Sequence, residues 1–353
     1  MPAPLTVDAA RLRADLAAAD YTVDAVLARI GEPGQEGLGR NCTVPADVAL
    51  GDARDPLATL IRVFLLQQSV LTADVTGVLD AAALLAAEYL AEDRGRLFAL
   101  VDVRPYGSPD DGASGWLVAD PTPGLDHIVD PTEPEYVLGA SPASTTLAQI
   151  AMRAPVGSAL DLGTGCGVQS LHLARHAARI VGTDVNPRAL ELAALTAALN
   201  GADVDLREGS LYEPVAGERF DLIVSNPPFV MSPPRAEADT LAYREANFEA
   251  DALVETLVRG AADHLAPGGS LQLLTNWAVL DQPWEERLRG WVPDGCDAWV
   301  IERERLDVFS YIEMWLADAG LAGRPGWRAA YDEWLAYFDH LGIRSVGMGW
   351  ILV

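Results

Sequence analysis

The chain has 353 residues, half of them hydrophobic, with 25 basic against 51 acidic residues and a formal net charge of −26. This length allows one large domain or two smaller ones, with enough apolar residues for a substantial core. A surface this acidic repels a phosphate backbone, which disfavours RNA or DNA as a partner and favours neutral or cationic substrates.

Three features of the sequence narrow its class. No run of about eighteen apolar residues is free of charges or turn residues, so we expect no contact with a membrane. The N-terminus carries acids early and does not resemble a signal peptide. The three cysteines, Cys42, Cys166 and Cys296, are far apart and odd in number, which argues against a disulfide framework or a metal site. Every basic residue is Arg and Ala is abundant, which is typical of a high-GC bacterial genome, so we expect a bacterial, cytoplasmic protein.

Residues 1–95 are expected to form a helical N-terminal domain. Apolar residues recur at helical spacing in segments such as VDAARLRADLAAA and DAAALLAAEYLAED. Thr22 and Asp55 stand where helix starts need a cap, and Pro56 suits a first helical turn. The glycine-rich stretch 31–39 interrupts the pattern.

Residues 96–145 are expected to form a β-hairpin and a linker. The strand-like runs RLFALVDVRP and GWLVADP are joined by the turn-rich YGSPDDGAS, and the Pro-rich stretch 121–145 follows. Helices followed by a hairpin resemble a winged-helix module, which binds DNA in some proteins and forms a lid or a dimer interface in others. Residues 1–95 hold 7 Arg against 14 acidic residues, so the lid or interface role is favoured.

Residues 146–353 are expected to form the main domain, because strand-like and helical segments alternate from here on. SALDLG, RIVGTDV and FDLIVS read as strands, while PRALELAALTAALNG reads as a helix. Such alternation predicts an α/β fold with a doubly wound, mostly parallel sheet covered on both faces. Ligands of these sheets bind at the carboxyl ends of the strands.

A glycine cluster follows the first strand of this domain. Gly163, Gly165 and Gly167 stand between SALDLG and the next helix, but Val168 replaces the glycine that a dinucleotide fingerprint needs. Asp161 precedes the cluster, and Asp184 ends the second strand, 19 residues after Gly165. This offset is close to that of a ribose-binding acid.

A second polar strand end occurs in DLIVSNPPFV. Its apolar run stops at Asn226, and Pro227, Pro228 and Phe229 follow. The Asn226 side-chain carbonyl and the Pro227 backbone carbonyl can both accept from an NH2 group, and the prolines hold these oxygens rigidly. Phe229 can stack on a flat substrate group, a contact worth about 1–3 kcal/mol for a nucleobase.

The ordered set DLGTGCG, GTDVNP and NPPF resembles the class I S-adenosylmethionine-dependent methyltransferases, in particular the amino-methylating group with Asn-Pro-Pro-aromatic. Release-factor glutamine N-methyltransferases and ribosomal RNA base N-methyltransferases share these motifs. The resemblance covers about residues 140–290 and implies a Rossmann-like, seven-stranded, mostly parallel sheet whose last strand is antiparallel. It implies S-adenosyl-L-methionine as cofactor, Asp161 near its amino end, and Asp184 on its ribose hydroxyls. The cofactor-binding set that follows from it is Asp161, Gly163, Thr164, Gly165, Cys166, Gly167, Asp184, Val185, Asn186, Gly209, Ser210, Leu211 and Asn226.

The sequence therefore predicts a methyltransferase that acts on an amide or amino nitrogen of a protein or small molecule. Asn226, Pro227, Pro228 and Phe229 are its expected catalytic residues. Two alternatives stay open: a ribosomal RNA base N-methyltransferase, and a non-enzymatic S-adenosylmethionine-binding regulator. Weaker substrate-binding candidates are Tyr136, Arg235, Tyr243 and Arg244. Histidines 172 and 176 are expected to be exposed or capping, and the aromatic tail from Trp315 onward is expected to pack in a core or interface.

Overall fold

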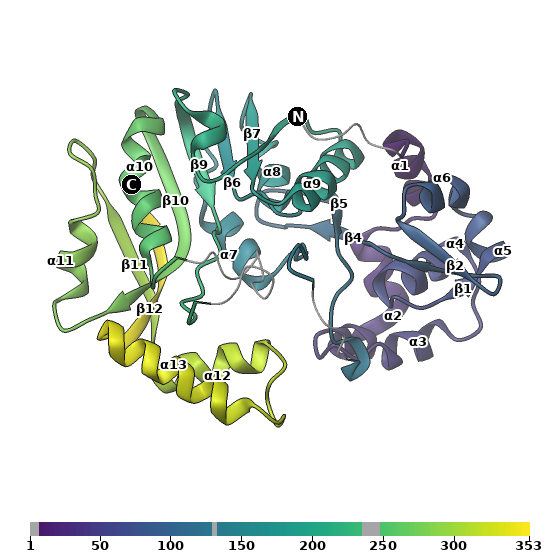
Figure 1. Ribbon diagram of the computed structural model, residues 1–353. Coiled ribbons are helices and arrows are strands. Elements are labelled where there is room, and N and C mark those ends of the chain that lie inside the picture. The colour runs from purple at the N-terminus through teal and green to yellow at the C-terminus, as the bar shows by residue number, and fades with distance from the viewer. Residues whose placement is uncertain (1–6, 129–132, 235–247) are drawn as a thin grey trace.

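The computed structural model describes residues 7–128, 133–234 and 248–353. A helical N-terminal part lies at one end, an open sheet with helices on both faces lies in the middle, and a pair of long helices lies near the other end (Figure 1). No helix in these described ranges has both the length and the apolarity to cross a membrane.

The central sheet has seven strands in the order β11-β12-β10-β9-β6-β7-β8. These strands are β6 (Ala159–Leu162), β7 (Ile180–Asp184), β8 (Val204–Glu208), β9 (Phe220–Ser225), β10 (Leu265–Val279), β11 (Trp299–Asp307) and β12 (Ser345–Leu352). Strands β6 to β10 pair in parallel, whereas β12 runs antiparallel to both β10 and β11. The expected seven-stranded, mostly parallel sheet with an antiparallel last strand is confirmed.

Helices cover both faces of the sheet, as its apolar strands require. On one face lie α7 (Pro142–Ile150), α8 (Val168–Leu173) and α9 (Pro187–Asn200), and on the other lie α10 (Ala252–His264) and α11 (Trp284–Arg289). Successive strand side chains alternate between these cores: Leu160 packs with α10, and Ala159 packs with α7 and α8. Because β6, β7, β8 and β9 run parallel to one another, the loops that follow them all lie at the same edge of the sheet.

The N-terminal part combines short helices with a small antiparallel sheet. Its elements are α1 (Ala9–Ala18), α2 (Val23–Leu38), α3 (Val44–Leu50), α4 (Pro56–Leu60), the π-helical turn η1 (Ile61–Leu65), β1 (Val70–Leu71), α5 (Thr72–Thr76), α6 (Ala81–Ala86), β2 (Leu90–Asp93) and β3 (Arg96–Ala99). The expected caps form, because Thr22 Oγ1 accepts from the Ala25 N–H at 3.3 Å and Asp55 Oδ1 accepts from the Ala58 N–H at 3.2 Å. The glycine-rich interruption appears as a kink in α2 at Gly31, where φ is 64°.

Two boundaries in this part differ from the sequence expectation. The helix expected to run through residue 93 ends at Ala86, and residues 90–93 instead pair with β3. The run RLFALVDVRP splits into β3 and β4 (Asp102–Gly107), and β4 pairs separately with β5 (Ser114–Ala119). Tertiary pairing overrides the helical apolar spacing of a short alanine-rich segment here.

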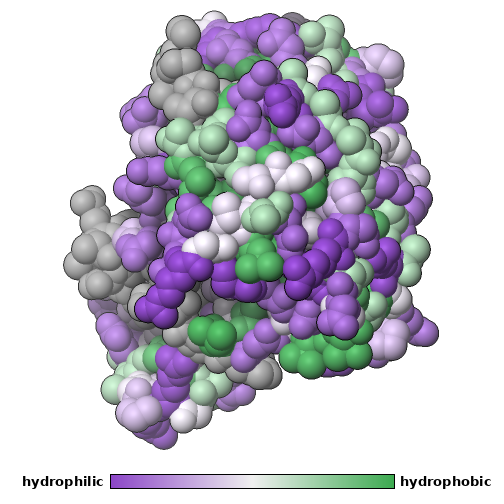
Figure 2. All heavy atoms as spheres, turned by 90° about the vertical axis from the view of Figure 1, so that its right-hand side faces the viewer, coloured by the Kyte–Doolittle hydropathy of each residue, from purple (hydrophilic) through white to green (hydrophobic). Residues whose placement is uncertain are grey.

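The β4–β5 pair joins the N-terminal part to the central domain. Residues of β5 and α9 pack side by side, and the Trp116 N–H donates to Asn200 Oδ1 at 3.0 Å while the Val118 N–H donates to Thr196 Oγ1 at 3.0 Å. Apolar side chains of α8 and α9 share one continuous core with the N-terminal part. On its outer face this part shows small apolar patches set among hydrophilic side chains (Figure 2).

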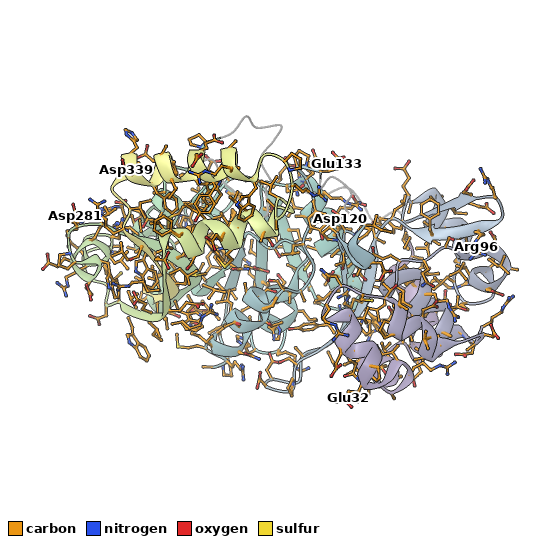
Figure 3. The ribbon with its side chains drawn as sticks, turned by 90° about the horizontal axis from the view of Figure 1, so that it is seen from below. Glu32, Arg96, Asp120, Glu133, Asp281 and Asp339 are labelled. Atoms are coloured by element: carbon orange, nitrogen blue, oxygen red, sulfur yellow. The ribbon has the colours of Figure 1, made fainter. Side chains whose placement is uncertain are left out.

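A pair of helices, α12 (Val308–Asp318) and α13 (Trp327–Leu341), is inserted between β11 and β12. They form an aromatic core of their own with Val230 and Met231, so the expectation that the tail packs in a core is confirmed. Seen from below, this pair and the N-terminal part occupy opposite ends, with Asp120 and Glu133 between them (Figure 3). The short 3-10 turn η2 (Leu125–His127) precedes this middle region, and η3 (Glu213–Val215) follows β8.

Candidate active site

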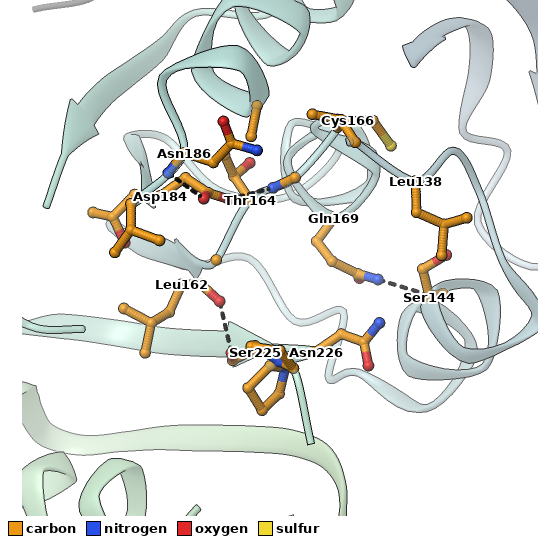
Figure 4. A pocket seen from close by; sticks show the side chains of 18 of the residues that line it. Leu138, Ser144, Leu162, Thr164, Cys166, Gln169, Asp184, Asn186, Ser225 and Asn226 are labelled. Atoms are coloured by element: carbon orange, nitrogen blue, oxygen red, sulfur yellow. Dashed lines mark hydrogen bonds between the residues drawn. The ribbon is translucent and has the colours of Figure 1, made fainter. Parts of the chain in front are cut away.

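A cavity of about 520 Å³ lies at the carboxyl ends of the central strands, where the alternating pattern predicts a ligand site. Its wall is built by the loops after β6, β7, β8 and β9, by residues 134–139, and by the start of α7. Asp184 and Asn186 stand on one side of it, with Ser225 and Asn226 across from them (Figure 4). Among the described lining residues the charged ones are both acidic, Glu135 and Asp184.

The glycine loop after β6 needs its glycines for two different reasons. Gly163 and Gly165 have φ of 76° and 55°, in the left-handed region that residues with side chains rarely adopt. A Cβ added at either position would have no neighbouring atom within 4 Å. Both line the cavity, so their lack of bulk leaves room for a ligand. Gly167, with φ of 82°, instead faces α9, where an added Cβ would lie 3.4 Å from Ala193.

Asp161 lies beneath this loop and is 1% exposed. Its Oδ2 accepts from Thr164 Oγ1 at 2.7 Å, from the Ser170 N–H at 2.9 Å and from Ser170 Oγ at 2.7 Å. Burial raises the pKa of this carboxyl to about 6, against the opposing effect of the Ser170 and Thr164 donors. The side chain is absent from the cavity wall, and the contacts that it makes shape the loop rather than face a ligand.

Asp184 ends β7 and lines the cavity directly. Its Oδ2 accepts from the Gly165 N–H at 2.9 Å, and its Oδ1 accepts from the Asn186 N–H at 2.9 Å. Burial raises the pKa of Asp184, while these backbone donors act in the other direction. Each carboxylate oxygen retains acceptor capacity for a further donor, which suits a ligand that presents hydroxyl groups.

Asn226 leaves β9 at the opposite wall. Ser225 Oγ donates to the Leu162 carbonyl at 2.6 Å, which ties the end of β9 to β6. Asn226, Pro227 and Pro228 all line the cavity. The Asn226 Oδ1 is buried and accepts no hydrogen bond from any residue in the described ranges. An unpaired buried amide oxygen costs about 1–3 kcal/mol, and because Asn226 lines the cavity, a ligand that donates to this oxygen would remove that cost.

Two further segments complete the wall. After β8, Gly209, Ser210 and Leu211 line the cavity, and Leu211 holds a positive φ of 50°. The second segment, residues 134–139, is held by two hydrogen bonds. Asn186 Nδ2 donates to the Glu135 carbonyl at 2.8 Å, and the Val137 N–H donates to Asp120 Oδ2 at 2.8 Å.

The structure brings most of the predicted residues together in this cavity. Lining it are Tyr136, Gly163, Thr164, Gly165, Cys166, Asp184, Val185, Asn186, Gly209, Ser210, Leu211, Asn226, Pro227 and Pro228. Asp161 and Gly167 support the loop from behind, and the Phe229 ring lies edge-on to Trp315, with 6.4 Å between ring centroids. Arg235, Tyr243 and Arg244 lie outside the described residues.

Sequence reasoning missed several lining residues that come from other elements. Gln169 Nε2 donates to the Ser144 carbonyl at 2.7 Å, which joins α8 to α7, and Leu138 and Phe248 add apolar surface. A local signal for this wall is the polar run ASPAST at residues 140–145, where α7 starts. The prediction that His172 is exposed or caps a helix is wrong, because the side chain is buried. Its Nδ1 lies 2.6 Å from Asp111 Oδ2, and its Nε2 lies 2.7 Å from Tyr106 Oη. No cluster that could hold a metal ion occurs among the described residues.

Comparison with known families divides the chain in two. Residues 140–282 match the family described as "Methyltransferase small domain", and residues 18–100 match "Domain of unknown function (DUF7059)".

Relatives match over the same region. The release factor glutamine methyltransferase of Geobacter sulfurreducens is 34% identical over 163 residues, which is 42% of this chain and 55% of that protein. The ribosomal RNA small subunit methyltransferase C of Erwinia tasmaniensis is 36% identical over 129 residues, 36% of this chain and 33% of that protein. The chain thus spans about half or less of the length of these two relatives.

Among solved structures, a methyltransferase from Pyrococcus furiosus aligns with a TM-score of 0.34 and 22% identity, over 51% of this chain and 83% of that one. A 16S rRNA methyltransferase from T. thermophilus, in complex with AdoMet and guanosine, aligns with a TM-score of 0.37 and 20% identity, over 59% of this chain and 55% of that one. The family match covers the cavity-bearing region, residues 140–282, and together with the strand order of the sheet it confirms the expected class I S-adenosylmethionine-dependent methyltransferase fold.

Proposed function

We propose that this protein transfers the methyl group of S-adenosyl-L-methionine to an amide or amino nitrogen of a protein or small molecule. The observation that carries the proposal is the unpaired, buried Asn226 Oδ1, which stands in the same cavity as the glycine loop and Asp184. A cofactor-binding regulator would have no use for an acceptor held at this place, whereas a nitrogen methyltransferase needs one.

The residues present fit the nucleoside cofactor. Gly163 and Gly165 leave open space beside the backbone, and Asp184 offers carboxylate oxygens to ribose hydroxyls. Gly209, Ser210 and Leu211 form the wall after β8, where the adenine would lie. When bound, S-adenosyl-L-methionine supplies an electrophilic methyl group. Cys166, buried and with its thiol pKa raised by burial to about 12, stays neutral and adds no competing nucleophile.

On the acceptor side, Asn226 holds and orients the nitrogen. Its Oδ1 would accept one hydrogen of the NH2 group, and the Pro227 carbonyl would accept the other. The two prolines restrict the backbone, so these acceptors need little rearrangement during the reaction. Because an amide lone pair is delocalised, alignment of nitrogen and methyl carbon supplies much of the rate.

Charge favours a protein or small-molecule acceptor over ribosomal RNA. The described part of the cavity wall holds two carboxylates and no basic side chain, and the whole chain carries a net charge of −26. A phosphate backbone requires cationic contacts near the reactive base. A neutral or cationic polypeptide segment with a glutamine or asparagine side chain meets no such repulsion.

The test is to incubate the full-length protein with methyl-labelled S-adenosyl-L-methionine and a bacterial lysate, then separate protein, RNA and small-molecule fractions. We expect label in protein or small molecules, stable to mild base as an N-methyl group is and an ester is not. Label confined to RNA would select the ribosomal RNA alternative. Tight cofactor binding without transfer to any fraction would contradict the proposed function.

A further inference from the structure

The inserted pair α12–α13 packs directly on the chain that follows the candidate catalytic asparagine. Val230 and Met231, four and five residues after Asn226, lie in one apolar core with Tyr311 and Trp334. The pair lies beyond residues 140–282, which match the methyltransferase family, and is inserted between β11 and β12 of the central sheet.

Tyr311 makes hydrogen bonds in addition to these apolar contacts. Its side chain is fully buried, and its Oη accepts from the Met231 N–H at 3.1 Å and from Asn276 Nδ2 at 3.0 Å. Asn276 is itself fully buried and belongs to β10, the strand that pairs with β9 up to Ser225. One phenol oxygen therefore connects the chain after Asn226 to the neighbouring strand of the sheet.

Tyr337 makes a similar contact on α13. Its Oη accepts from the Ala250 N–H at 3.0 Å, two residues after Phe248, which lines the cavity. Next to it, Asp251 forms a buried ion pair with Arg287 and accepts from the Ala278 N–H at 2.7 Å. Through these two tyrosine hydroxyls, the helical pair thus holds two separate stretches of chain that adjoin the cavity-lining residues Pro228 and Phe248.

The Asn226 backbone is fixed from both sides as a result. Before it, Ser225 Oγ is bonded to the Leu162 carbonyl, and after it two prolines lead within a few residues to the Met231 contact. Pro227 and Pro228 fix φ at two of the four residues between Asn226 and Met231, which limits how much of a shift at Met231 is absorbed before it reaches Asn226.

From this geometry we propose that α12–α13 is a positioning element of the active site: Tyr311 fixes the Asn226–Met231 segment and Tyr337 fixes the Phe248–Asp251 segment. This inference rests on the proposed methyl transfer, because it assigns the tyrosines an effect on the aim of Asn226 at the acceptor. Neither tyrosine lines the cavity, so the expected effect is on turnover and not on cofactor binding.

The test compares Tyr311→Phe and Tyr337→Phe with Tyr331→Phe in the full-length protein. Tyr331, on α13, donates to Glu313 at an exposed position, so its variant is a matched loss of one hydroxyl from the same helical pair. With the labelled fraction as acceptor, we expect Tyr311→Phe to lower kcat by about ten- to a hundredfold, the size of effect that a misplacement near 1 Å produces. The KM for S-adenosyl-L-methionine and the stoichiometry of its binding should stay within about twofold of wild type.

Hydrogen–deuterium exchange with bound S-adenosylhomocysteine gives a readout that needs no acceptor. Exchange should rise in peptides covering residues 229–231 for Tyr311→Phe, and stay unchanged in the loop 163–167. A kcat for Tyr311→Phe within twofold of that of Tyr331→Phe would overturn the proposal. If Tyr311→Phe binds less than one cofactor per chain, Tyr337→Phe decides alone: a severalfold loss of kcat supports the proposal and an unchanged kcat overturns it. Absence of transfer by the wild-type protein would contradict the proposed function instead, and the exchange data would still decide the positioning role.

Discussion

The ends of the neighbouring strands β6 and β9 both lie at the cavity, but they are built in opposite ways. At the end of β6, Asp161 satisfies donors from Thr164 and Ser170, and the Gly165 N–H is satisfied by Asp184, so the polar groups that shape the loop bond to one another. At the end of β9, Asn226 Oδ1 is buried without a protein donor in the described ranges.

This difference indicates that the two strand ends contribute to ligand binding in different ways. A loop whose carboxylates bond to its own backbone keeps its shape whether or not a ligand is bound, and its contribution to binding is preorganisation. A buried amide oxygen without a partner costs stability and is tolerated where a ligand supplies the missing donor. We therefore propose that the loop after β6 serves the cofactor by its shape, and that the end of β9 serves the acceptor by a specific hydrogen bond.

Removing the unpaired acceptor should have the largest effect. We expect Asn226→Ala to lower kcat by roughly a hundred- to a thousandfold, the loss seen when one preorganised transition-state hydrogen bond is deleted. Cofactor affinity measured by calorimetry should change by less than about threefold, because Asp184 and the glycine loop remain. Gln149→Ala, which deletes an exposed amide on α7, is the matched control. Full turnover by Asn226→Ala would remove the proposed role of this oxygen.

Asp161, beneath the loop after β6, should make the free energy of unfolding depend on pH. Asp161 has its pKa raised by burial to about 6 from an ordinary value of 3.8, so the folded state holds this proton more tightly than the unfolded chain does. Its contribution to stability is therefore present below about pH 4 and is lost as pH rises toward 6, by at most about 3 kcal/mol.

This contribution is measured as the difference between wild type and Asp161→Asn, which has no proton to release. Chemical denaturation from pH 4 to pH 7 should show the wild type losing free energy of unfolding relative to the variant, with the change complete slightly above pH 6. Other carboxyl groups cancel in this difference. A difference that is constant with pH would mean that Asp161 titrates normally.

Two of the three glycines of the loop, Gly163 and Gly167, sharpen the comparison further. Both Gly163→Ala and Gly167→Ala place a side chain at positive φ and should cost about 1–2 kcal/mol in stability. Only at Gly163 does the added methyl group enter the open space of the cavity, whereas at Gly167 it presses on Ala193 of α9. We expect cofactor affinity to fall for Gly163→Ala, by severalfold to tenfold, and to stay near wild type for Gly167→Ala. Equal losses of affinity would show that the loop acts as one unit.

Sequence patterns predicted the sheet and most of the cavity because both depend on local signals. Apolar strands ending in glycine, Asp184 or Asn226 locate the carboxyl edge of a parallel sheet without any knowledge of the packing. They do not show which side of the loop a residue faces: Asp161 and Gly167 belong to the predicted cofactor-binding set, and neither lines the cavity. Contacts between distant segments, such as Gln169 with Ser144, carry no local signal at all.

The last prediction concerns Asp184, the charged group that the end of β7 presents to the cavity. Asp184→Asn keeps a carbonyl that can accept from one of the two backbone N–H groups now bonded to the carboxylate, and it loses the charge. Since a hydrogen bond to a charged group contributes about 1.5 kcal/mol more than none, cofactor affinity should weaken by about tenfold in calorimetry. Asp203→Asn, a charge-matched change at an exposed position before β8, should leave affinity unaltered. Because burial raises the pKa of Asp184, acidification should weaken cofactor binding to wild type at a pH above the usual range for an aspartate, and Asp184→Asn should lack this dependence. Wild-type affinity in Asp184→Asn would leave the ribose contact without support and would make the loop a purely steric cradle.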